Sequence, residues 1–485
     1  MKRILSLTVL VYLGLAFGHS SAGAAPVVTG LYSFTGGSDG GIPEGSLIQS
    51  TDGNFYGTTL SGGTYNFGAV FKITASGTLT TLYSFQGGFA NGGDGDSPYA
   101  GVVRGLDGNF YGTTAFGGTN SSGSIFRMAP SGSTTQLYQF SFAGTDGNQP
   151  YAPLIQGRDA SLYGTTYFGG ANAFGNVFKI TSNGVLSVLY AFTGGSDGAF
   201  PDSSLILFNN GTFCGTATQG GTTNAYCGTG GCGTVFIINT NNNHEAVLHA
   251  FNGNDGATPN AVLVQGTNGN YYGTTVYGGT NGYGTIFQIS SAGAFTNLYS
   301  FTFTNGDGAF PETPLVLGSD GNFYGTTIQG GTSTNCDGGC GTIFRIGPTG
   351  SGYTNLWSFT NGSDGAIGED GGYNAALVQG VDGSFYGVTS GGGAYGQGVV
   401  FKLTVPLRPQ PNQINSIQLT STNVVVKIPT VAGEDYQLQF NNSLTGIWSN
   451  VVGASVTNAI GSSLTFTHVG GASQPRRFYR FDIAP

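Results

Sequence analysis

The 485-residue sequence has few charged residues and no concentration of positive charge. Asp, Glu, Lys and Arg make up 8% of the chain, where roughly 25% is usual. The 14 basic residues are outnumbered by 23 acidic ones, which leaves a net charge of −9, and the Lys and Arg residues form no cluster. Because nucleic acids and anionic membrane surfaces attract basic patches, the composition excludes nucleic-acid binding and a polybasic membrane-surface segment.

Histidines and long apolar runs are also scarce. The histidines are scattered along the chain, which argues against a histidine-rich metal site: His19, His244, His249 and His468. The apolar run at residues 4–17 is too short to span a bilayer, and no other segment is long enough. The sequence therefore predicts no transmembrane segment.

The N-terminal run instead has the features of an export signal. Lys2 and Arg3 precede it, and Ala22-Gly23-Ala24 fits the small-residue rule for cleavage. We expect residues 1–24 to be a signal peptide and the protein to be secreted or held in the cell envelope.

Glycine is the abundant residue, at 89 positions of 485, against a usual share of about 7%. The chain is nevertheless 39% apolar and 13% aromatic. Disordered chains combine few aromatic residues with high charge, so this composition indicates a folded protein rich in turns.

A repeat accounts for most of the glycine. The segment Leu31-Tyr32-Ser33-Phe34 recurs in similar form from residues 82, 137, 189, 248, 298 and 356, at spacings of 50 to 59 residues. The first copy predicts four strands, here named A to D, at residues 46–49, 54–59, 69–74 and 78–85. Asp-Gly and Ser-Gly pairs between strands favour tight hairpins, and four strands per repeat is typical of propeller blades.

The two ends of the repeat region predict how the ring closes. The last A–B–C set, residues 375–404, has no strand D, while residues 27–34 form a strand D without a preceding set. We therefore expect an all-β fold in which residues 25–404 form a seven-bladed β-propeller closed by the N-terminal strand. A linker at 405–413 leads to residues 414–485, which are expected to form a small β-sandwich of the immunoglobulin or fibronectin type.

The repeat motif resembles a known family. Residues 50–59 (STDGNFYGTT), the pair Gly62-Gly63 and Val70-Phe71-Lys72-Ile73 are similar to the GloVer (Gloeobacter/Verrucomicrobia) tandem repeat of exported bacterial proteins. The resemblance covers about residues 31–404, and residues 436–440 and 477–481 resemble a small β-domain that often ends such proteins. The sequence lacks the Pro-Glu-Pro sorting signal of some members. The resemblance implies export and a repeat fold, but no activity and no catalytic residues.

Two sets of aspartates precede glycine in nearly every blade. One set lies between strands A and B, with asparagine in two blades: Asp52, Asp107, Asp159, Asn210, Asn268, Asp320 and Asp382. The other lies in the crossovers from strand D to the next strand A: Asp39, Asp94, Asp146, Asp197, Asp255, Asp307 and Asp364. Both sets are expected to cap turns. No cofactor is predicted, although Ca²⁺ in the crossovers is left as an alternative.

A third position varies from blade to blade between nearly fixed neighbours. In six blades it follows a proline, and its occupants are Glu44, Tyr99, Tyr151, Asp202, Asn260, Glu312 and Asn374. Acids, amides and phenols at the mouth of a propeller channel suit sugar hydroxyls or a polar peptide. These residues are therefore predicted to bind an extracellular carbohydrate or protein, and the alternative is a solvated loop position that is free to drift.

Two other functions remain open. Glu44, Asp202 and Glu312 could act as paired carboxylates in an enzyme of extracellular polysaccharides, although their radial positions argue against it. No Ser-His-Asp or Cys-His arrangement fits, so no catalytic residue is assigned. The third possibility is a purely structural envelope protein.

The cysteines support an oxidising compartment. Cys227 and Cys232 lie in the B–C loop of blade four, and Cys336 and Cys340 lie in that of blade six. Two local disulfides are predicted, against the alternative of one four-cysteine zinc site. Cys214 replaces a motif tyrosine and is expected to be a buried free thiol.

Overall fold

The structure is a computed structural model. It describes residues 25–88, 93–142, 144–208, 211–240, 242–367, 376–405, 416–420, 423–429, 435–441, 449–456, 463–468 and 478–484. These residues form strands and turns and contain no helix long and apolar enough to cross a membrane. The predicted signal peptide at 1–24, most of the linker and Asn374 lie outside the described residues. The chain divides into two units, of which one is Val27–Thr404.

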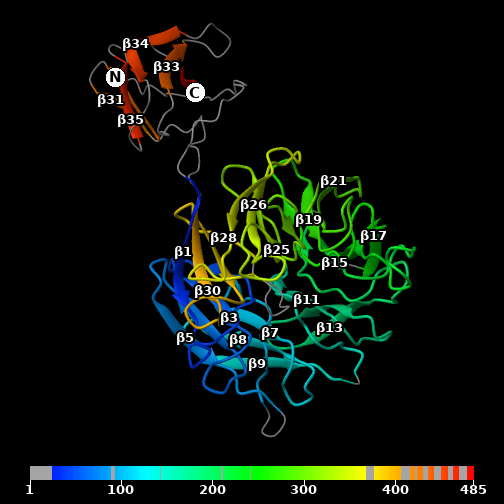
Figure 1. Ribbon diagram of the computed structural model, residues 1–485. Coiled ribbons are helices and arrows are strands. Elements are labelled where there is room, and N and C mark those ends of the chain that lie inside the picture. Colours follow the sequence, from blue (N-terminus) through cyan, green and yellow to red (C-terminus); the bar gives the residue numbers. More distant parts are fainter. Residues whose placement is uncertain are drawn as a thin grey trace, which may run out of the picture. The chain divides into compact units, whose positions relative to one another are not determined.

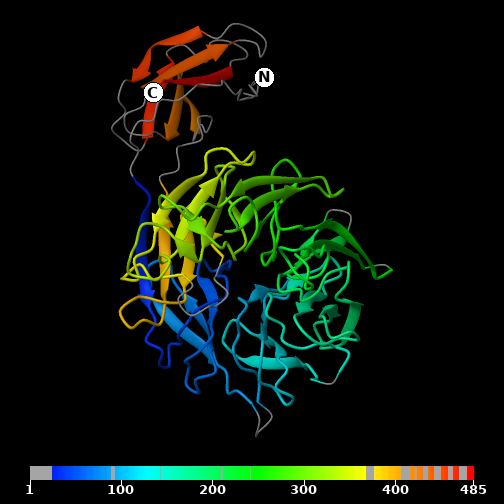
Figure 2. The same cartoon turned by 45° about the vertical axis from the view of Figure 1, so that its right-hand side comes forward.

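This unit is a β-propeller of seven four-stranded antiparallel sheets. Figure 2 shows the blades arranged around a central axis. Blades one to three contain β2 (Ile48–Gln49), β3 (Phe55–Thr59), β4 (Ala69–Ile73), β5 (Leu79–Ser84); β6 (Val103–Arg104), β7 (Phe110–Thr114), β8 (Ser124–Met128), β9 (Thr134–Gln139); and β10 (Ile155–Gln156), β11 (Leu162–Thr166), β12 (Asn176–Ile180), β13 (Leu186–Ala191).

Blades four to six have the same strand order. In Figure 1 they lie in the green to yellow-green part of the ribbon. They contain β14 (Ile206–Leu207), β15 (Thr212–Ala217), β16 (Thr234–Asn239), β17 (His244–Ala250); β18 (Val264–Gln265), β19 (Tyr271–Thr275), β20 (Thr285–Ile289), β21 (Phe295–Ser300); and β23 (Val316–Leu317), β24 (Phe323–Thr327), β26 (Thr342–Ile346), β27 (Thr354–Ser358). In addition, β22 (Gly308–Ala309) pairs with β25 (Gln329–Gly330) in the loops of blade six.

Blade seven joins the two ends of the repeat region. Its sheet has the order β28 (Val378–Gln379), β29 (Phe385–Thr389), β30 (Val399–Thr404) and β1 (Val27–Ser33). The N-terminal strand β1 pairs with β30, with Val27 opposite Thr404 and Ser33 opposite Val399.

The core lies between adjacent blades and repeats around the ring. Strand B is buried along its whole length, and at five of the seven blade junctions its tyrosine stacks on the strand-B aromatic of the next blade, as for Tyr56 and Phe110 at 4.3 Å between ring centroids. The same contact joins blade seven to blade one, where the Tyr386 and Phe55 centroids are 4.1 Å apart. The tyrosine of the repeated Tyr-Gly-Thr-Thr motif thus makes most of these ring contacts between blades.

Glycine within strand B is required by close packing rather than by a turn. A Cβ added at Gly57 would lie 2.7 Å from both the Phe71 ring and the Leu47 side chain. Strand glycines often mark such a close approach.

The second unit contains two three-stranded sheets. One has the order β31 (Ser416–Thr420), β32 (Asn423–Pro429) and β35 (Ser463–His468), and the other β34 (Ser449–Val456), β33 (Asp435–Asn441) and β36 (Phe478–Ala484). Val426, Leu438 and Phe466 are buried. The predicted immunoglobulin-like sandwich remains a prediction for this unit.

Candidate functional site

The crossovers into blades one to six share an unusual backbone conformation. In blades one to six, the residue before the crossover proline is not glycine and has a positive φ of 52° to 57°: Ile42, Ser97, Gln149, Phe200, Thr258 and Phe310. Such a conformation is disfavoured for residues with a Cβ, above all for β-branched ones. It persists only where surrounding contacts hold it.

Hydrogen bonds to two blades provide those contacts. The Ile42 N–H donates to the Gln397 carbonyl of blade seven at 2.9 Å, and the Ile42 carbonyl accepts from the Leu60 N–H of blade one at 2.9 Å. The prolines pack just as closely, because a Cβ added at Gly68 would lie 2.6 Å from Cδ of Pro98 in the next blade. The residue after each proline is therefore held in place by the backbone, whatever its own side chain.

Those residues converge on one pocket of about 300 Å³. Six of the seven variable positions line it: Glu44, Tyr99, Tyr151, Asp202, Asn260 and Glu312. The seventh, Asn374, lies outside the described residues, and its neighbour Ala376 lines the pocket. The rest of the lining consists mainly of small residues such as Ser46, Gly101 and Ser204, which leave the six side chains as the principal chemical groups.

Buried carboxylates act on the pocket tyrosines. Glu44 is 3% exposed and Asp202 is 8% exposed. Burial raises the pKa of Tyr99, and the charges of Glu44, Asp96 and Asp202 raise it further. Burial also raises the pKa of Tyr151, with further contributions from Tyr99 and Asp202. Both phenols remain protonated donors at neutral pH.

Glu312 and Asn260 bring two further polar side chains to the same pocket. Burial raises the pKa of Glu312 to about 7, and no hydrogen bond contributes to that shift. Oδ1 of Asn260 is buried and has no hydrogen-bond partner among the described residues. Buried polar groups are normally hydrogen-bonded, so Oδ1 of Asn260 is suited to accept a donor from a ligand.

Sequence reasoning missed the aromatic side chains beside this pocket. The Tyr99 and Tyr151 rings meet edge to face with centroids 5.0 Å apart, Phe116 packs against both, and Tyr167 packs on Tyr151 at 5.5 Å. Phe116 and Tyr167 follow the Tyr-Gly-Thr-Thr motif by two residues and one residue, at positions that also vary between blades. The variation of these positions between blades is the sequence signal from which Phe116 and Tyr167 could have been predicted.

The described members of both aspartate sets serve the turns, as predicted, and Asn210 lies outside the described residues. Asp52 accepts from the Tyr56 hydroxyl at 2.8 Å. In the crossovers, Asp197 accepts from the Tyr190 hydroxyl at 3.0 Å and from the Thr193 N–H at 2.7 Å. Asp364 accepts from the Trp357 indole at 3.1 Å. Within the described part of the chain, no three His, Cys, Asp or Glu side chains gather closely enough to hold a metal ion.

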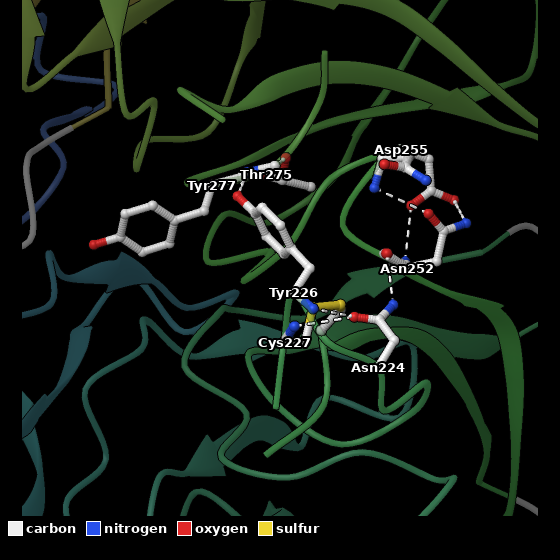
Figure 3. The surroundings of a disulfide bond; sticks show 10 residues. Asn224, Tyr226, Cys227, Asn252, Asp255, Thr275 and Tyr277 are labelled. Atoms are coloured by element: carbon white, nitrogen blue, oxygen red, sulfur yellow. Dashed lines mark hydrogen bonds between the residues drawn. A yellow bond between two sulfur atoms is a disulfide. The ribbon is translucent and has the colours of Figure 1, made fainter. Parts of the chain in front are cut away.

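The cysteines form two local disulfides, Cys227–Cys232 and Cys336–Cys340. The predicted pairing is confirmed, and the alternative of one four-cysteine zinc site is wrong. Figure 3 shows the first disulfide with Asn224, whose Oδ1 accepts the backbone N–H groups of Tyr226 and Cys227. Cys214 is a buried free thiol, as expected.

Several solved structures are similar to this chain. The extracellular domain of a protein from B. thetaiotaomicron, described as a hybrid two-component system, has 12% identity, covers 91% of this chain and 53% of its own, and gives a TM-score of 0.48. A Bacteroides uniformis protein described as a 6-phosphogluconolactonase has 14% identity, with coverages of 83% and 95% and a TM-score of 0.44. A Mycobacterium tuberculosis puromycin-hydrolysing peptidase has 10% identity, coverages of 81% and 59%, and a TM-score of 0.45.

The chain thus spans about half the length of the first of these proteins. No curated protein matches the sequence. The model of the Gloeobacter/Verrucomicrobia repeat matches residues 13–228 and 222–410, which cover most of the chain. The blades described above correspond to those repeats, and the chain belongs to the Gloeobacter/Verrucomicrobia repeat family.

Proposed function

We propose that this is an exported protein that binds an extracellular saccharide in the pocket at the centre of one propeller face. The observation that carries the proposal is the convergence of six variable crossover positions on one pocket. Their neighbours are nearly fixed and hold the backbone rigidly. The side chains can therefore differ from blade to blade according to what they contact.

The chemistry of the pocket favours a neutral saccharide. Carboxylate and amide oxygens accept hydrogen bonds from sugar hydroxyls, and the phenols of Tyr99 and Tyr151 donate and accept them. None of the described residues that line the pocket is Lys, Arg or His. A phosphorylated, sulfated or uronic acid ligand would meet carboxylates without a compensating positive charge.

A glycan and peptide array with the full exported chain tests this proposal, followed by titration calorimetry on the best neutral glycan. We expect Tyr99→Ala and Glu44→Gln each to weaken binding by about tenfold or more, the loss of one or two hydrogen bonds to a buried group. Leu106→Ala is the control, because Leu106 is 82% exposed in an A–B turn, away from the pocket. Unchanged affinity in both pocket variants, or binding of peptides alone, would contradict a saccharide site.

A second candidate function is an enzyme acting on extracellular polysaccharides. Glu312 favours it, because a carboxyl with a pKa of about 7 can serve as a general acid near neutral pH. Glycoside hydrolysis needs a second carboxylate, and Glu44 and Asp202 line the same pocket. New reducing ends that depend on Glu312 would establish the enzyme. The matched control is Glu245→Gln, since the pKa of Glu245 is also raised to about 7 by burial but the residue lies on outer strand β17.

Export and ring closure belong to the same proposal. Two disulfides support an oxidising compartment. The pairing of β1 with β30 supports closure of the ring by the N-terminal strand. The C-terminal unit would act as an attachment module with a sandwich fold. Intact mass measurement of the exported protein tests cleavage after Ala24.

A further inference from the structure

A second pocket lies where the B–C loop of blade four meets blade five. It has a volume of about 360 Å³. It is lined by Gln219, Tyr226, Cys227, Gly230, Gly231, Ala257, Thr258 and Tyr277. Two tyrosines, one amide side chain and exposed glycine backbone make it both apolar and hydrogen-bonding.

The Tyr226 ring is held firmly although it is exposed. The Cys227–Cys232 disulfide closes its loop, and Nδ2 of Asn224 ties the loop to the Asn252 carbonyl at 2.8 Å. The Tyr226 hydroxyl accepts the Gly278 N–H of blade five at 3.0 Å. Figure 3 shows the ring extending from the disulfide loop towards Thr275 and Tyr277.

Both tyrosines present open ring surface beside this pocket. Tyr226 is 55% exposed and Tyr277 is 47% exposed. One side of Tyr226 is covered, because a Cβ added at Gly253 would lie 2.7 Å from the ring. A fixed, half-exposed aromatic ring loses little conformational freedom when a ligand covers it, which favours binding.

The second pocket adjoins the central one through two crossovers. Thr258 lines the second pocket and lies two residues before Asn260, which lines the first. Tyr277 packs on Phe310 with ring centroids 5.4 Å apart, and Phe310 lies two residues before Glu312. Burial raises the pKa of Tyr277, and the nearby charge of Glu312 adds to it. Tyr277 therefore lies between the two pockets.

We propose that the second pocket is a further saccharide subsite, so that a chain bound in the central pocket continues past Tyr277 to Tyr226. This inference rests on the proposed function. A sugar ring has an apolar C–H face that packs on an aromatic ring, while its hydroxyls bond to amide and backbone groups. Gln219 and the glycine backbone supply those groups here.

Blade six provides a natural comparison within the same molecule. Its B–C loop also begins Gln329-Gly330-Gly331 and also contains a disulfide, Cys336–Cys340. Asp337 follows the first cysteine, no tyrosine is present in the loop, and Gly391 of blade seven occupies the position of Tyr277. The disulfide alone does not make the subsite: the junction of blades four and five adds Tyr226 from blade four and Tyr277 from blade five.

The test compares short and long ligands on the full exported chain. The probes are ladders of two to six units of four neutral glycans: β-1,4-glucan, α-1,4-glucan, β-1,4-mannan and β-1,4-xylan. For the glycan that binds, we expect the six-unit chain to bind about tenfold tighter than the two-unit chain. Three variants should each reduce the ratio of six-unit to two-unit affinity to about twofold or less, without changing the affinity for the two-unit chain. They are Tyr226→Ala, Tyr277→Ala and the double variant C227S/C232S.

The controls separate the subsite from folding and from the central pocket. C336S/C340S removes an equivalent disulfide, and Tyr395→Ala removes an exposed tyrosine of blade seven. Both variants should keep the tenfold ratio of six-unit to two-unit affinity. Equal affinity of long and short chains in the unaltered protein would overturn the subsite and leave the central site standing. A length effect that survives both tyrosine variants would also overturn it. If neither the ladders nor the glycan array shows binding, the proposed function itself fails.

Discussion

Replacement of Glu312 by glutamine is expected to stabilise the protein at neutral pH but not in acid. Burial raises the pKa of this carboxyl from 4.5 to about 7 in the folded state. Between those pH values the unfolded chain releases its proton while the folded chain keeps it, so stability falls as the pH rises. The full loss of stability is present above the folded-state pKa of about 7, and no stability is lost below pH 4.5.

The magnitude follows from the same two pKa values. Each tenfold step in proton concentration is equivalent to about 1.4 kcal/mol, so the loss by pH 8 reaches up to about 3 kcal/mol, less where solvent reaches the carboxyl. For a propeller of this size, that corresponds to a melting temperature about 4 °C higher in Glu312→Gln at pH 8.

Calorimetric melting of both proteins from pH 4 to pH 8 tests this expectation. The two transitions should coincide at pH 4 and separate progressively as the pH approaches 7. Glu245→Gln should behave in the same way, since burial raises the pKa of Glu245 to about 7 as well. If the melting temperatures of Glu312→Gln and the parent differ by the same amount at every pH, the reasoning is refuted. Such a result would mean that the folded protein does not hold Glu312 protonated.

Three further outcomes are expected. Replacing Cys336 and Cys340 by serine should lower the free energy of unfolding by about 2 kcal/mol, the chain-entropy value for a loop this short, and denaturant titration measures it. Deleting residues 25–34 removes buried Phe34, which alone is worth about 3–5 kcal/mol, and should lower the melting temperature of the whole ring; an unchanged transition would refute closure by the N-terminal strand. Gly57→Ala should destabilise by about 1–3 kcal/mol in the same assay, because its Cβ would meet Leu47 and Phe71.

The repeat in the sequence was sufficient to predict the blades because every blade uses the same local contacts. The turn aspartates, the disulfides and the pairing partner expected for residues 27–34 all depend on short-range chemistry or on counting strands. The variable crossover position was recognisable for a related reason: it departs from a pattern that its neighbours keep.

The contacts between blades could not be predicted in the same way. The meeting of Tyr99 with Tyr151, the burial of Glu312 and the position of Tyr277 between two pockets depend on the tilt and spacing of neighbouring sheets. The positive φ of Ile42 and Thr258 was equally hidden, since β-branched residues normally avoid it.

The backbone of the crossovers separates the shape of the ring from the chemistry of its centre. Contacts to two blades fix the left-handed residue and the proline, so the backbone before each variable position is held by groups other than its side chain. A side chain at one of these positions can change without altering the backbone that carries it, while neighbours such as Tyr99 and Tyr151 adapt to each other. A new preference for a ligand therefore requires only point substitutions on a frame that stays the same, and such a ring is a suitable starting scaffold for engineered recognition.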